Sequence, residues 1–129
     1  MAFAYTEAQS AQAVAELQWA KADKIMFTKF TSCIGLMGIK DDQVIGVHLP
    51  LRDDHNAVTN DDIDAAIALL DGVVNPVIIG AISAWKASAS DVFTHLVDTL
   101  NPVEQYPYGD GIYGGSVDDG RVQPEYTVE

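Results

Sequence analysis

Two apolar stretches on either side of a polar turn restrict how this chain can fold. Residues 34–39 read Ile-Gly-Leu-Met-Gly-Ile, residues 44–51 read Val-Ile-Gly-Val-His-Leu-Pro-Leu, and Lys40-Asp41-Asp42-Gln43 lies between them. Short apolar runs that are bounded by turn residues are typical of strands. Because the connection is short and polar, the sequence predicts that the two runs pair as a β-hairpin.

The two residues with the most reactive side chains lie on or next to this hairpin. Cys33, the only cysteine, directly precedes the first run, and His48 lies within the second. A hairpin lets the two face each other across neighbouring strands. A lone thiol cannot form an internal disulfide, so Cys33 is either a buried packing residue or a nucleophile.

The remaining pattern predicts an α+β fold. We expect a mixed or antiparallel β-sheet, either single or divided into two packed sheets, flanked by three helices. The helices are expected at residues 6–22, 60–71 and 89–100, and further strands at residues 25–31 and 77–82. Capping pairs favour these helix starts, namely Thr6 with Gln9, Thr59 with Asp62, and Ser88 with Asp91.

The chain length favours one domain followed by a tail. With 129 residues, 48% of them hydrophobic, the chain can build one core, which we place at residues 1–102. Residues 103–129 are rich in glycine, tyrosine and acidic side chains and contain five of the ten glycines. This composition predicts a segment that is extended or disordered.

Charge limits the partners that the chain can bind. The formal net charge is -12, from 19 acids and 7 bases, which opposes binding to nucleic acid or to an anionic membrane. No apolar run approaches the roughly 20 residues that span a bilayer. With one thiol and no basic, apolar start, the sequence predicts a cytoplasmic protein whose partner or substrate is another protein, and it leaves the oligomeric state open.

A Cys–His pair supplies a nucleophile and a base. A free thiol is only a few per cent ionised at neutral pH, so a histidine within hydrogen-bond reach activates it. Gly35 permits close backbone approach, and Thr28, Thr31 or Ser32 could orient the imidazole. A lone cysteine with Phe30 before it and Ile34 directly after it is, however, more often a small buried hydrophobe.

No metal site is predicted from the sequence. Asp53, Asp54 and His55, together with Asp61, Asp62 and Asp64, could offer oxygen and imidazole ligands to a divalent cation. Their spacing matches no known loop, and acids at helix starts usually complement the helix dipole. We therefore expect neither a metal nor another cofactor.

Residues 28–51 resemble the core of a known enzyme family. Ser32-Cys33, a short apolar segment, an acidic turn and then Ile45-Gly46-Val47-His48-Leu49-Pro50 are similar to the core of the bacterial chemotaxis-receptor glutamine deamidases. The Asp- and Ala-rich residues 61–66 and the Lys-bearing segment 80–87 continue the similarity. The same Cys-His core is shared by cytotoxic-necrotizing-factor-like toxins, which deamidate a glutamine on host small GTPases.

The resemblance implies a cysteine-dependent hydrolase that deamidates protein glutamine without a cofactor. It makes Cys33 the nucleophile, His48 the base and Thr28 the group that assists the histidine. From the residues themselves, we expect the oxyanion or substrate near Ser32 and Gly35. Thr31 stands where the family has a glycine, which leaves a second hypothesis open. In that hypothesis the chain is a non-catalytic adaptor or assembly subunit, which binds a protein through its acidic surface and tail.

Overall fold

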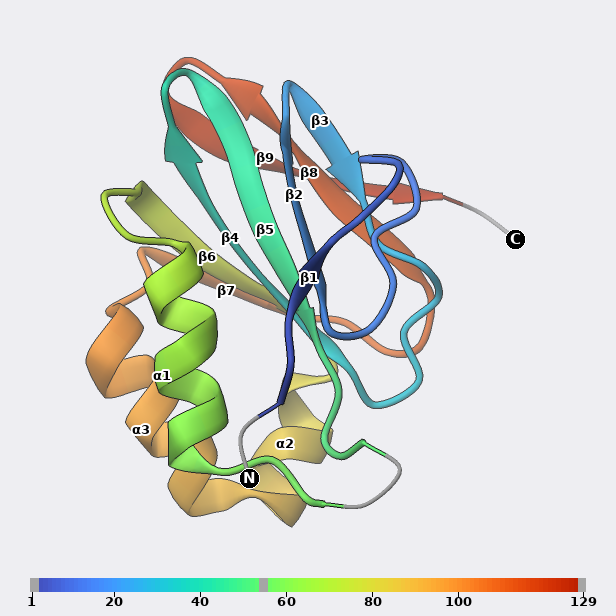
Figure 1. Ribbon diagram of the computed structural model, residues 1–129, viewed down its shortest axis with the longest axis vertical. Coiled ribbons are helices and arrows are strands. Elements are labelled where there is room, and N and C mark those ends of the chain that lie inside the picture. The colour runs from blue at the N-terminus through green and yellow to red at the C-terminus, as the bar shows by residue number, and fades with distance from the viewer. Residues whose placement is uncertain (1–2, 54–55, 128–129) are drawn as a thin grey trace.

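A six-stranded mixed sheet forms the central layer of the protein over residues 3–53 and 56–127, which are the residues that the computed structural model describes (Figure 1). The hairpin of β4 (Ile34–Lys40) and β5 (Gln43–Leu49) lies in the middle of this sheet, so its strands are paired on both sides. In spatial order the strands are β1 (Thr6–Glu7), β2 (Gln18–Ala22), β5 (Gln43–Leu49), β4 (Ile34–Lys40), β6 (Val74–Gly80) and β7 (Glu104–Pro107).

A second, antiparallel sheet and a layer of helices cover the two faces of the central sheet (Figure 1). The second sheet has the order β3 (Lys24–Met26), β8 (Ile112–Asp118) and β9 (Arg121–Thr127). The helices are α1 (Asn60–Leu69), α2 (Ile82–Ser88) and α3 (Ser90–Leu100). The predicted α+β class is therefore confirmed, in its form with two sheets.

The two faces of β4 pack into two separate parts of the hydrophobic core. Ile34 and Leu36 pack with the helices, whereas Cys33, Met37 and Ile39 pack toward the second sheet. Successive side chains of a strand point to opposite faces, so an apolar strand with both faces covered supplies both cores. Cys33 consequently faces the space between the two sheets.

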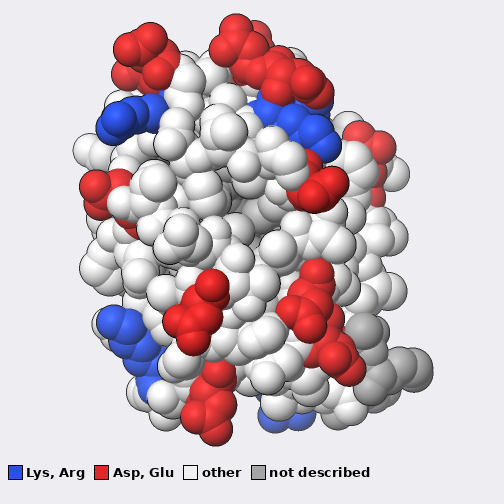
Figure 2. All heavy atoms as spheres, turned by 90° about the vertical axis from the view of Figure 1, so that its left-hand side faces the viewer, with Lys and Arg blue, Asp and Glu red and all other residues white. Residues whose placement is uncertain are grey.

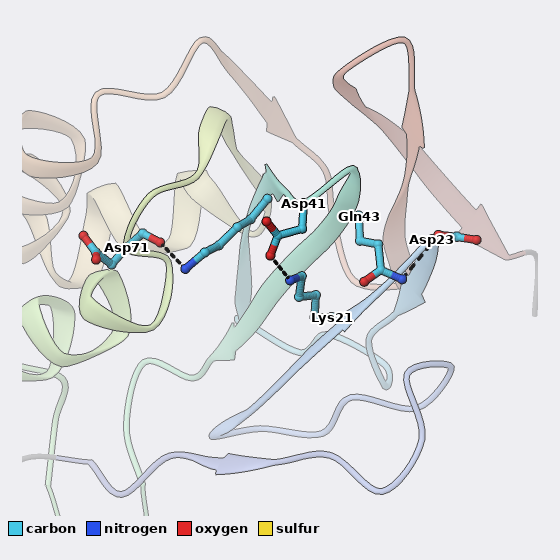
Figure 3. A network of polar contacts seen from close by, with 6 residues as sticks. Lys21, Asp23, Asp41, Gln43 and Asp71 are labelled. Carbon is cyan, nitrogen blue, oxygen red and sulfur yellow. Dashed lines mark hydrogen bonds and ion pairs between the residues drawn. The ribbon is translucent and has the colours of Figure 1, made fainter.

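The hairpin prediction is confirmed, with Gly35 opposite His48 in the ladder between β4 and β5. Polar contacts hold its turn against neighbouring segments (Figure 3). They join Lys21 Nζ to Asp41 Oδ2 at 2.6 Å, Gln43 Nε2 to Asp23 Oδ1 at 3.4 Å, and Lys40 Nζ to the carbonyl oxygen of Asp71 at 2.8 Å.

Two of the three predicted helices are present. The helix expected at residues 60–71 is α1, and its capping box of Thr59 and Asp62 is formed. The helix expected at residues 89–100 is α3, but its N-cap is Ala89, which makes no side-chain cap bond. Ser88 cannot cap α3 because it is the last residue of α2, a helix that the sequence analysis missed.

The helix predicted at residues 6–22 is wrong. Its two ends form β1 and β2, which pair in parallel, and the segment between them is a loop. Backbone groups of that loop bond to distant partners: Val14 N–H donates to Met26 and Leu17 N–H to the carbonyl of His48. Tertiary pairing therefore overrides the helix propensity of an alanine-rich segment.

The prediction that residues 103–129 form a tail beyond a domain at residues 1–102 is also wrong, as far as residue 127. β7 pairs with β6 in the central sheet, and β8 pairs with β3 and β9 in the second sheet. Glycine serves close packing here, since a Cβ on Gly114 or Gly115 would overlap β3 or Met37. The composition that suggested disorder instead permits a sheet that packs closely on the central one.

Two predicted strands are present, but with other boundaries than the sequence predicts. The strand expected at residues 25–31 is regular only in β3, which ends at Met26, and Phe27 and Phe30 continue it as isolated bridges. The strand expected at residues 77–82 is β6, which begins earlier at Val74 and ends at Gly80.

Carboxylates are spread over the surface. On the face in Figure 2 they stand at several separate places, and near the top some lie beside lysine or arginine side chains. Within residues 3–53 and 56–127, none of the helices has the length and apolar character needed to cross a bilayer.

Candidate functional site

Cys33, His48 and Glu16 meet between the two sheets. Their thiol sulfur, a ring nitrogen and a carboxylate oxygen all lie within 4.8 Å of one another. Cys33 directly precedes β4, His48 belongs to β5, and Glu16 comes from the loop between β1 and β2. Cys33 and His48 are buried and Glu16 is exposed, so the cluster reaches solvent on the Glu16 side.

Strand register explains why Cys33 and His48 share a face. Gly35 lies opposite His48, and Cys33 lies two residues before Gly35, so period-two alternation puts both side chains on the same side of the sheet. A Cβ on Gly35 would lie 2.5 Å from Cε2 of Phe27. The missing side chain therefore makes room for this ring, which lies edge-on to the imidazole with the centroids 5.5 Å apart.

The His48 imidazole is held in one tautomer. Its Nδ1 lies 2.8 Å from the carbonyl oxygen of Val14, which can only accept, so Nδ1 carries the proton. Its Nε2 is buried without a hydrogen-bond partner among the described residues, and the side chain is 0% exposed. Burial lowers the pKa of His48, although the Val14 hydrogen bond and Glu16 act in the opposite direction. The ring is thus neutral, with a free lone pair on Nε2.

The Cys33 thiol is also neutral in this structure. The side chain is 1% exposed, and its Sγ–H donates to Glu16 Oε1 at 3.3 Å. Burial and then the Glu16 carboxylate raise the pKa of the Cys33 thiol to about 12, whereas a backbone hydrogen bond from Thr31 lowers it. The cluster is therefore a neutral thiol and a neutral imidazole beside an exposed carboxylate.

The other predicted site residues surround this cluster through their backbones. The Thr28 N–H donates to the Val14 carbonyl at 2.9 Å, the same oxygen that holds His48. Ser32 is exposed with a φ of 74°, and its carbonyl accepts from Trp85 Nε1 at 3.0 Å. Gly35 lies inside β4, paired with β5 and β6. Thr28 therefore reaches the histidine indirectly, through the backbone of Val14.

Sequence reasoning missed Glu16 and Val14. Both lie in residues 6–22, which the sequence predicts to be a helix, and nothing local in that segment indicates a loop that reaches β5. Among the described residues, the candidate metal ligands Asp53, Asp61, Asp62 and Asp64 form no cluster of three or more converging ligand groups. Asp54 and His55 lie outside the described residues, and the Asp62 carboxylate accepts from the backbone N–H groups of Phe3 and Thr59.

Fold and site together define an α+β protein with two packed sheets and a buried Cys–His pair between them. Comparison with known proteins found no family model, no curated protein and no solved structure that matches the chain. The assignment of function therefore depends on the geometry of the site.

Proposed function

We propose that this protein is a cysteine-dependent amidohydrolase that deamidates glutamine side chains of another protein. One observation carries the proposal: Cys33 Sγ and a ring nitrogen of His48 lie within 4.8 Å on one face of the sheet. A nucleophile beside a base that a third group orients is the arrangement that covalent catalysis requires. The orienting group here is the Val14 carbonyl, at 2.8 Å from Nδ1.

The reaction follows from the protonation states of the two groups. His48 Nε2 takes the thiol proton as Cys33 Sγ attacks the carboxamide carbon, and backbone N–H groups near Ser32 and Cys33 stabilise the oxyanion. His48 then protonates the leaving nitrogen, ammonia departs and a thioester remains. Water, deprotonated by His48, attacks the thioester, which releases glutamate and restores the thiol.

The neutral thiol determines when the proton moves. Because burial and Glu16 hold the pKa of Cys33 at about 12, a resting thiolate is scarce at neutral pH. The proton must therefore pass to His48 as the carbon–sulfur bond forms. The Glu16 side chain, which is exposed and bonded to Sγ, must also turn away to admit the carboxamide.

Mass spectrometry tests this proposal directly. Candidate proteins and an unfolded glutamine-rich protein are incubated with the wild-type chain, with Cys33→Ala and with His48→Gln, in a chelating buffer. We expect a gain of about one dalton per deamidated glutamine with the wild type only. A gain that persists with Cys33→Ala would exclude Cys33 as the nucleophile, and no gain on any substrate would count against the activity.

One observation favours the alternative of a non-catalytic adaptor. Cys33 is 1% exposed, as expected for a packing residue, whereas Tyr126 is 71% exposed and Tyr108 is 38% exposed. Exposed tyrosines are typical of protein interfaces. If the chain is an adaptor, Cys33→Ala keeps full partner binding while Tyr126→Ala and Tyr108→Ala weaken it, and no substrate gains mass.

A further inference from the structure

We infer that Glu16, Cys33 and His48 form a binding site for one Zn²⁺ ion. The inference does not depend on the proposed deamidase activity, because it rests on donor atoms and not on turnover. Two independent observations support it. Three donor atoms of different kinds converge within 4.8 Å, and Nε2 of the fully buried His48 has no hydrogen-bond partner in the described part of the chain.

The spacing of the donors suits a tetrahedral ion. Zinc binds sulfur at about 2.3 Å and nitrogen or oxygen at about 2.0–2.2 Å, so neighbouring ligands lie roughly 3.5 Å apart. Cys33 Sγ and Glu16 Oε1 are already 3.3 Å apart. The other separations among the three donors are within 4.8 Å, so shifts of about 1 Å would bring the set to tetrahedral spacing.

His48 makes the kind of hydrogen bond that holds a metal-binding histidine in place. A histidine that binds a metal usually donates its other ring N–H to a carbonyl or carboxylate, which fixes the tautomer and the ring orientation. His48 Nδ1 donates to the Val14 carbonyl at 2.8 Å, and the Phe30 ring lies 4.7 Å from the imidazole, centroid to centroid. Nε2 is thereby left with its lone pair free.

The donor set selects the metal. Thiolate and imidazole favour zinc over the hard cations magnesium and calcium, which prefer oxygen ligands only. Three protein ligands leave a fourth position for water or another ligand. On binding, the Cys33 thiol releases its proton to the buffer while sulfur donates an electron pair to the ion.

Zinc occupancy and nucleophilic catalysis exclude each other at this site. The ion uses the sulfur that would attack a carbonyl and the nitrogen that would accept the thiol proton. Zinc would therefore hold the pair inactive, and removal of the ion would release it.

Metal titration of the full chain tests the inference. The chelator-treated protein is titrated with Zn²⁺ against a chromogenic chelator, and separately with Co²⁺ while absorbance is recorded. We expect one Zn²⁺ per chain and a near-ultraviolet sulfur-to-cobalt band. Cys33→Ser should abolish the band, and Glu16→Gln should weaken binding at least tenfold.

Matched controls separate this site from weak binding by the acidic surface. Glu7→Gln removes one exposed carboxylate, as Glu16→Gln does, and should leave the affinity unchanged. His48→Gln should weaken zinc binding, and His95→Gln, which changes a histidine outside the site, should not. Circular dichroism checks that each variant is folded. A missing cobalt band, a stoichiometry well below one, or equal losses in Glu7→Gln and Glu16→Gln would each overturn the inference.

Discussion

The carbonyl oxygen of Val14 lies 2.8 Å from Nδ1 of His48 and joins the loop between β1 and β2 to the buried imidazole. Because burial lowers the pKa of His48, the folded protein binds a proton there less readily than the unfolded chain does. The unfolded chain therefore gains protons first as pH falls below about 6.5, and stability decreases.

The free energy of unfolding should thus fall from pH 7 to pH 5 more steeply in the wild type than in His48→Gln. The slope that one histidine contributes is at most about 1.4 kcal/mol per pH unit. Urea unfolding in a chelating buffer measures it, and His95→Gln, which changes a partly exposed histidine, is the control. Equal slopes in wild type and His48→Gln would contradict the prediction.

Glu16 should control the reactivity of Cys33. The Glu16 carboxylate is the second largest cause, behind burial, of the raised pKa of the Cys33 thiol. Glu16→Gln should therefore lower this pKa. Each unit of decrease multiplies the thiolate fraction by about ten well below the pKa. Alkylation by iodoacetamide at pH 8 should accelerate several-fold in Glu16→Gln, with access to the sulfur similar because glutamine has the same size. Glu7→Gln should label at the wild-type rate; an unchanged rate in Glu16→Gln would show that burial alone determines the pKa.

Gly35 should not tolerate a side chain. A methyl group there would meet the Phe27 ring, which also contacts the His48 imidazole. We expect Gly35→Ala to lower the free energy of unfolding by about 1–3 kcal/mol, as measured by urea. Gly109→Ala is the matched control, since a Cβ at Gly109 meets nothing within 4 Å. Equal stabilities of the two variants would show that Phe27 shifts without cost.

Val122 should be essential for the layer that β8 and β9 form. Its side chain is 6% exposed and packs in the core between the sheets. Val122→Asp buries an unpaired charge and should cost about 3 kcal/mol or more. Tyr126→Asp, at a side chain that is 71% exposed on the same strand, should change stability by less than about 0.5 kcal/mol. Urea midpoints check both values. A Val122→Asp variant that is as stable as the wild type would show that packing of β9 on the central sheet does not contribute to stability.

Sequence patterns predicted the elements whose signals are local. The β4–β5 hairpin has its turn between two apolar runs, and α1 has a capping box and an apolar face within one short segment. Because register follows from the turn, the placement of Cys33 and His48 on one face of the sheet was predictable as well. The hydrogen-bond partners of the pair were not, because Val14 and Glu16 come from another part of the chain.

Non-local pairing explains the errors. The loop around Val14 is held by Met26, Thr28 and His48, none of which changes the local helix propensity of residues 6–22. Likewise, the glycines of β8 signal flexibility until β3 and Met37 are placed against them. Glu16 could be identified as a site residue only after that loop had been placed beside β5.

The pairing of β3 with β8 has a consequence for how the protein matures during synthesis. Lys24 pairs with Ser116 and Ile25 with Gly115. Because the paired residues are about 90 positions apart in sequence, β3 cannot pair with β8 until most of the remaining chain has been synthesised. Until then Met37, against which Gly115 packs, lacks this cover. Newly made molecules are therefore most open to chaperone capture at this face of the hairpin before β8 emerges.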